Sequence, residues 1–79
     1  MHSNWTYYEI RNGATGQLRV AFRYDPNTYK AQSLNKNTSK WEDDTDFVFM
    51  DRLVRGEPDL DRLDGIPDWA YDAQGNLIP

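Results

Sequence analysis

The chain has 79 residues, no cysteine and a formal net charge of −4. This length fits one small domain, and the lack of cysteine excludes disulfides, thiolate metal sites and a cysteine nucleophile. No apolar run is long enough to span a membrane. The first residues lack the basic and apolar regions of a signal peptide, so we expect a cytoplasmic location and no membrane partner.

Charge is divided unevenly along the chain. Residues 1–41 carry a net charge of +4, whereas residues 42–79 carry −8. Surfaces of opposite sign steer association with partners and do not determine a fold. The division therefore favours a protein that acts by binding.

A β-hairpin is predicted over residues 5–24. Apolar and polar residues alternate over 18–24, at the period of a strand, and 5–11 is rich in strand-forming residues. The segment between them contains Gly16, which suits a left-handed position at the end of a loop.

Two registers of this hairpin are possible. The first sets Tyr7 opposite Phe22. The second sets Tyr8 opposite Phe22, but it also brings Arg11 across from Arg19. Because like charges on directly opposed residues are unfavourable, the first register is the prediction.

A turn and a third strand follow the hairpin. Asp25 and Pro26 are typical of the first two positions of a type I turn. The third strand is expected over roughly residues 29–34, at an edge of the sheet, followed by a polar loop at 35–39. No internal repeat is recognised.

One helix is predicted over residues 43–55. Asp43 is the expected N-terminal cap, and Gly56 suits the residue that ends the helix. Helical spacing indicates an apolar stripe facing the core, formed by Phe47, Met50 and Val54, with Phe49 and Leu53 beside it.

Together these elements predict an α+β fold in the order β-β-β-α. A small three-stranded antiparallel sheet carries the helix on one face, with an open edge at which a second copy could pair. Residues 1–57 form the core domain, and residues 58–79 form an acidic extension that is partly docked on it. The expected core comprises Trp5, Tyr7, Val20, Phe22, Trp41, Phe47, Met50, Leu53 and Val54.

Catalytic and metal chemistry find little support. The single histidine is His2, near the start of the chain, and no serine triad can be assembled around it. The segment 59–65 has the spaced acids of a calcium loop, but Asp64 and Gly65 come one position too late. We therefore expect a non-enzyme without catalytic residues, metal or cofactor.

The leading functional prediction is a non-enzymatic accessory or regulatory module that binds another protein. Its expected surface combines acids with apolar anchors: Asp59, Leu60, Asp61, Leu63, Asp64 and Trp69. The alternative is nucleic-acid binding through a basic and aromatic hairpin face, formed by Tyr8, Arg19, Arg23 and Lys30. An acidic surface that mimics nucleic acid is a further alternative, and a homodimer through the open sheet edge is also considered.

A set of short motifs extends over residues 5 to 57. Their order is Tyr7-Tyr8, Thr15-Gly16, Phe22-Arg23, Trp41 with Asp44, a short helix and Arg55-Gly56-Glu57. In this order the chain resembles small uncharacterised proteins of actinobacteria and their phages. Those proteins have no assigned activity, so the resemblance implies only a bacterial or phage accessory protein and transfers no functional residue.

Overall fold

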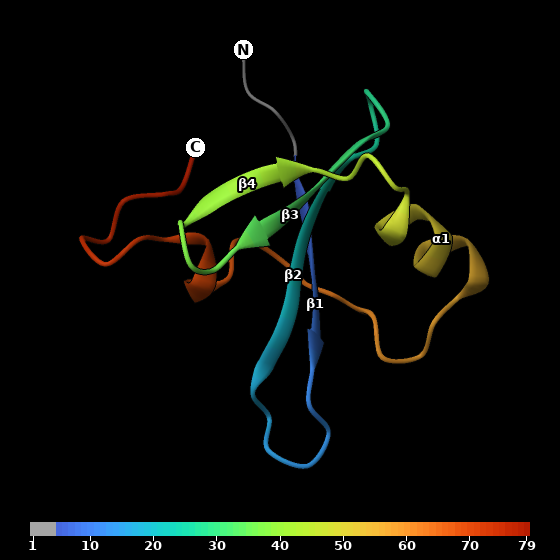
Figure 1. The fold of residues 1–79 in the computed structure, drawn as a ribbon, viewed down its shortest axis with the longest axis horizontal. Coiled ribbons are helices and arrows are strands. Elements are labelled where there is room, and N and C mark those ends of the chain that lie inside the picture. The colour runs from blue at the N-terminus through green and yellow to red at the C-terminus, as the bar shows by residue number, and fades with distance from the viewer. Residues whose placement is uncertain (1–4) are drawn as a thin grey trace.

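A computed structural model describes residues 5–79. It consists of one antiparallel sheet in the order β4-β3-β2-β1-β5, one α-helix and a short 3-10 helix. Figure 1 shows α1 on one side of the sheet and the C-terminal segment on the other. The elements are β1 Thr6–Arg11, β2 Leu18–Asp25, β3 Lys30–Asn35, β4 Lys40–Asp43, α1 Val48–Arg55, β5 Asp61–Arg62 and the 3-10 helix Asp68–Ala70.

The α+β class is confirmed, but the prediction of three strands is wrong because the sheet has five. Residues 40–43 form β4, which pairs with β3 and moves that strand from an edge into the interior of the sheet. Residues 61–62 form β5 on the outer side of β1. The short β5 is a weak sequence signal, since two residues cannot show a strand period.

The predicted register of the first hairpin is also wrong. Tyr8 lies opposite Phe22, and Ile10 lies opposite Val20. The register then shifts, so that Arg11 pairs with Leu18. A β-bulge at Arg19 thus absorbs one residue and keeps the two arginines apart, which removes the objection to this register.

The three hairpin loops share one construction. Each begins with an Asn or Asp whose side chain accepts hydrogen bonds from backbone N–H groups two or three residues later. Each ends with a residue of positive φ: Gly16, Tyr29 and Ser39. The second and third loops also share a ten-residue spacing, from Asp25 to Asn35 and from Lys30 to Lys40. This spacing is a short internal repeat, which was not recognised from the sequence alone.

Helix α1 begins at Val48, five residues later than predicted. Asp43 belongs to β4, and the capping role passes to Asp44. The Asp44 carboxylate accepts hydrogen bonds from the N–H groups of Val48 at 3.0 Å and Phe49 at 2.8 Å. Gly56, with a φ of 65°, ends the helix as expected.

The later start of α1 changes which side chains enter the core. Phe49 is fully buried and packs on Tyr8, Phe22 and Tyr24, whose ring centroids lie 4.9–5.5 Å away. Phe47 and Val54, both expected in the core, are 69% and 81% exposed. We call this side of the sheet the helix face, and its buried cluster is Tyr8, Ile10, Phe22, Ala31 and Phe49.

The opposite side of the sheet, which we call the tryptophan face, holds a second packed layer. Because successive residues of a strand point to opposite faces, Tyr7 and Arg23 lie here. Trp41 and Trp69 pack against Tyr7, with centroid distances of 6.2 Å and 5.8 Å. The expected single core is therefore two layers, and Trp5, Tyr7 and Trp41 belong to this second one.

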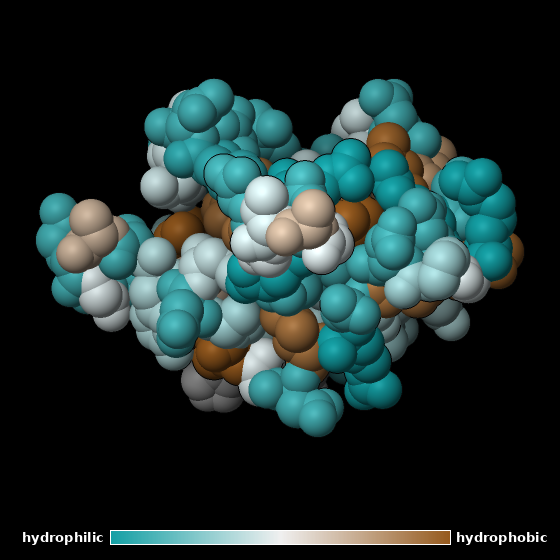
Figure 2. All heavy atoms as spheres, turned by 90° about the horizontal axis from the view of Figure 1, so that it is seen from below, coloured by the Kyte–Doolittle hydropathy of each residue, from teal (hydrophilic) through white to brown (hydrophobic). Residues whose placement is uncertain are grey.

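Residues 58–79 contribute to both layers. Leu60 packs against the helix-face cluster, and Ala70 and Ile78 are buried. The Ile78 carbonyl accepts a hydrogen bond from the Trp41 indole at 3.3 Å. Viewed from below, the surface is mainly hydrophilic, and apolar atoms reach it in separate places (Figure 2). Within residues 5–79, no helix has the length and apolar character needed to cross a membrane.

Candidate docking surface

The apolar anchors predicted between residues 59 and 69 serve the fold. Leu60 packs on the helix-face cluster. The Leu63 N–H donates to the Tyr7 carbonyl at 2.9 Å, and the Trp69 indole donates to the Glu9 carboxylate at 3.0 Å. Asp59, Asp61 and Asp64 are exposed. This segment thus offers charge to a partner, while the Leu60 and Trp69 side chains take part in the fold and Ile66 is 49% exposed.

The four residues of the alternative nucleic-acid face do not form one surface. Tyr8 is buried under α1, and Arg23 lies on the opposite face of the sheet with only 7% of its surface exposed. Arg19 is exposed at the bulge. Lys30 lies 3.7 Å from the Asp43 carboxylate. The expected shared face of Tyr8, Arg19 and Arg23 depended on the register that the structure corrects.

Arg23 is held by aromatic rings. Its guanidinium carbon lies 4.2 Å from the centre of Trp5 and 4.4 Å from the centre of Trp41, and its Nε donates to the Gln32 side chain at 2.7 Å. Burial lowers the pKa of Arg23, and the Tyr7 side chain opposes this shift. The cation–π sandwich therefore belongs to the packing of the tryptophan face.

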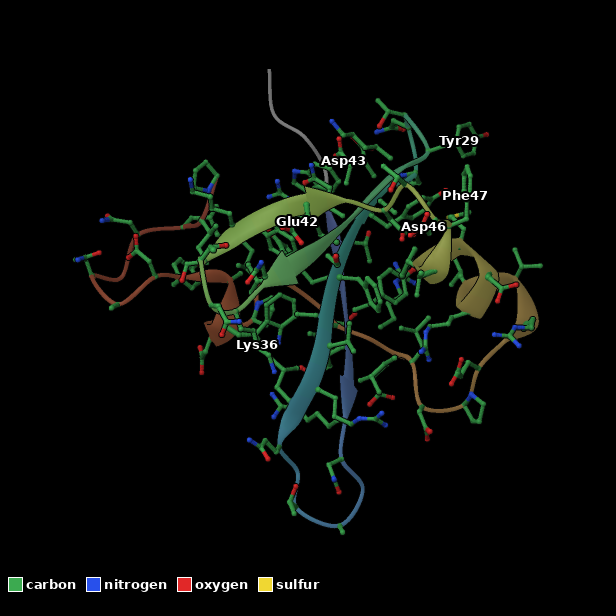
Figure 3. The ribbon with its side chains drawn as sticks, in the orientation of Figure 1. Tyr29, Lys36, Glu42, Asp43, Asp46 and Phe47 are labelled. Carbon is green, nitrogen blue, oxygen red and sulfur yellow. The ribbon has the colours of Figure 1, made fainter. Side chains whose placement is uncertain are left out.

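Two aromatic side chains remain exposed near the start of β3. Tyr29 is 78% exposed at the end of the β2–β3 loop, and Phe47 is 69% exposed just before α1. The Asp44 N–H donates to the Ala31 carbonyl at 2.9 Å, which ties the segment before α1 to the start of β3. Figure 3 shows Tyr29 and Phe47 at the same end of the molecule, directed away from the sheet.

The backbone at both aromatics adopts a conformation that side chains disfavour. The φ angles are 58° at Tyr29 and 57° at Phe47, in the left-handed region that costs a residue with a Cβ roughly 1–2 kcal/mol. A glycine at either position would avoid this cost. Neither aromatic ring offsets the cost, because neither ring is buried. Folding therefore does not account for an aromatic residue at either position.

Acidic and apolar groups surround Phe47. An open depression of about 380 Å³ is lined by Phe47 and Val48 together with charged residues of the helix. A second, of about 250 Å³, lies between β4 and α1 and has an apolar floor that includes Val20 and Phe22. Its rim carries Glu42, Asp43, Asp44 and Asp46. We call Tyr29, Asp46, Phe47 and Val48 the Phe47 surface.

The acids near this surface differ in their environments. A hydrogen bond from Gln32, and then the charge of Lys30, lower the pKa of Asp43. The Asp44 carboxylate already accepts two hydrogen bonds from the start of α1. Asp51 pairs with Arg55 at 2.8 Å, whereas no ion pair of Asp46 is present among the described residues. Asp46 is thus the acid most available to a basic partner.

No group of three or more potential metal-ligating side chains comes together within residues 5–79, and His2 lies outside them. The Phe47 surface combines apolar rings with a negative rim, a combination suited to recognition through packing and charge. Comparison with protein-family models, curated proteins and solved structures finds no match to the chain.

Sequence reasoning missed Tyr29 and Phe47 as surface residues. Phe47 fitted a helical stripe with Met50 and Val54, and nothing in that spacing showed that the helix begins after it. The available signal was Asp44, an equally good cap residue one position after Asp43. For Tyr29, the signal was the ten-residue spacing, which aligns it with the loop residue Ser39.

Proposed function

We propose that the protein is a non-enzymatic module that binds another protein through the Phe47 surface. The observation that carries this proposal is the pair of exposed aromatics, Tyr29 and Phe47, each on a backbone that favours glycine. Aromatic residues are enriched among the few side chains that dominate binding free energy. Their exposure in the free protein leaves them available for burial in a partner.

The charge around the aromatics indicates the chemistry of the partner. Asp46 is part of the surface, and Glu42 and Asp43 lie on the neighbouring rim. The complementary partner presents an apolar pocket bordered by lysine or arginine. Electrostatic attraction then raises the association rate, and burial of the rings slows dissociation.

The test compares exposed apolar residues inside and outside the Phe47 surface. Wild-type protein is first used to capture its partner from source lysate, with and without nuclease. Affinities of Phe47→Ala, Tyr29→Ala and Val54→Ala for the purified partner are then measured. Val54 is 81% exposed and lies outside the Phe47 surface, so Val54→Ala is the matched control.

We expect Phe47→Ala and Tyr29→Ala each to weaken binding by roughly tenfold or more, equivalent to about 1.4 kcal/mol. Val54→Ala should bind as wild type, and all three variants should keep the wild-type melting temperature within a few degrees. Equal affinity of all four proteins would contradict the proposal. Loss of capture after nuclease treatment would instead indicate nucleic-acid binding.

A further inference from the structure

The outer side of β4 is an open edge of the sheet. β4 pairs with β3 on its inner side, and no described residue forms a strand on its outer side. The other open edge belongs to β5, which has only two residues. A four-residue edge with unpaired backbone groups is a template for pairing with a further strand.

Backbone geometry identifies the groups that this edge presents. Asp44 donates to Ala31, so residues 40, 42 and 44 direct their backbone groups toward β3 in the alternating antiparallel pattern. Trp41 and Asp43 consequently direct their N–H and C=O groups outward. Within the described residues, no backbone hydrogen bond reaches the outward N–H or C=O of Trp41.

The charge of the β4 side chains changes from positive to negative along the strand. Lys40 stands at its start, Glu42 and Asp43 stand at its end, and all three are exposed. In Figure 3, the Lys36 loop and Asp43 lie at opposite ends of β4. A strand that is basic at one end and acidic at the other is complementary in charge to its own antiparallel copy.

We propose that two copies of this chain associate edge to edge through β4, around a two-fold axis at Trp41. Trp41 then exchanges backbone hydrogen bonds with Trp41 of the second copy. Lys40 faces Glu42 of the second copy, and the symmetry repeats this pair. The two five-stranded sheets thereby become one continuous sheet, in which two opposite-charge pairs flank a central tryptophan pair.

The alternative symmetric register is disfavoured by its charges. Centring the two-fold axis on Glu42 sets the two copies of Glu42 directly opposite each other, and like charges in that position are destabilising. Registers shifted by one residue fail because they oppose outward backbone groups to inward ones. Charge and hydrogen-bond direction thus select the same register.

The test uses charge reversal and its rescue. Sedimentation equilibrium over a micromolar-to-millimolar concentration series measures the mass of the 9.3 kDa chain. We expect wild type to reach twice this mass. In the Lys40→Glu variant, two acids face each other in each pair. In the Glu42→Lys variant, two lysines face each other. Each single variant should therefore dissociate roughly tenfold more readily.

Two combinations should restore association. The double variant Lys40→Glu/Glu42→Lys rebuilds both pairs with reversed sign, and an equimolar mixture of the two single variants forms a complementary heterodimer. Arg19→Glu and Asp59→Lys are matched charge-reversal controls at exposed positions off the edge, and both should associate as wild type. Far-UV circular dichroism verifies that each variant is folded.

The edge contact does not depend on the Phe47 surface, so Phe47→Ala should remain a dimer whatever its effect on partner binding. A wild-type chain that stays monomeric across the concentration series overturns the proposal. A dimer that survives both single charge reversals, or single variants that fail to recover when mixed, would also overturn it.

Discussion

Glu9 connects residues that are far apart in the sequence. It lies buried in β1, and its carboxylate accepts hydrogen bonds from Arg11 and from the Trp69 indole. The Arg11 hydrogen bond, aided by the Trp69 bond, lowers the pKa of Glu9 although burial opposes the shift. Because the folded-state pKa is depressed, Glu9 stabilises the fold above its unfolded pKa, and this contribution is lost as the pH falls through the folded-state pKa.

Glu9→Gln should therefore lower the free energy of unfolding by about 1 kcal/mol at neutral pH, because the hydrogen bonds from Arg11 and Trp69 lose their charged acceptor. The difference from wild type should shrink as the pH falls from the ordinary pKa of a glutamate through the lowered folded-state pKa of Glu9. Denaturant unfolding of both proteins at several pH values measures this difference. A gap that stays constant into the acid range would contradict the assigned role.

At the scale of single elements, α1 depends on one side chain before its first turn. Asp44 accepts two backbone hydrogen bonds through its two carboxylate oxygens. This arrangement fixes where the helix begins and turns Phe47 outward. The side chain that was expected to cap the helix, Asp43, instead accepts a hydrogen bond from Gln32 across the β3–β4 pair.

Asp44→Ala should destabilise the protein by about 1–2 kcal/mol, since it leaves two N–H groups of the first turn without their partner. Asp46→Ala is the control, because Asp46 is exposed and makes no hydrogen bond among the described residues. We expect that control to stay within about 0.5 kcal/mol of wild type in thermal unfolding. Equal effects of the two substitutions would show that the cap is not formed.

The first three strands and the end of the helix were predictable because their signals are local. Alternation over residues 18–24 and the glycine at position 56 each act through their nearest neighbours in the chain. The register was not predictable in this way, because a bulge at Arg19 changes pairing by one residue and reverses which side chains share a face. The candidate surface was missed for the same reason: exposure of Phe47 depends on where Asp44 starts the helix.

At the scale of the whole molecule, residues 58–79 complete the structure. They supply β5, a buried alanine and Ile78, whose carbonyl accepts a hydrogen bond from Trp41. They also include Trp69, which packs on Tyr7 at the tryptophan face of the sheet. Acids are frequent here and the segment was expected to be an extension, but Leu60, Ala70 and Ile78 among those acids pack inward.

Ile78→Ala should lower the free energy of unfolding by about 2–3 kcal/mol, because it removes buried methyl groups from this layer. Leu77→Ala changes the neighbouring side chain, which is half exposed, and should cost less than about 1 kcal/mol. Chemical denaturation of both variants, followed by tryptophan fluorescence, compares them. A loosely attached tail would give equally small effects at the two positions.

The residues that cover the tryptophan face, Trp69 and Ile78, are among the last to be synthesised. Strands β1 to β4 follow one another in both chain and sheet, so their contacts are local and form rapidly. The hydrogen bonds from Trp69 to Glu9 and from Trp41 to Ile78, however, form only after Trp69 and Ile78 have left the ribosome. The nascent chain therefore passes through a stage in which the first four strands have paired while Tyr7 and Trp41 still lack their contacts with Trp69.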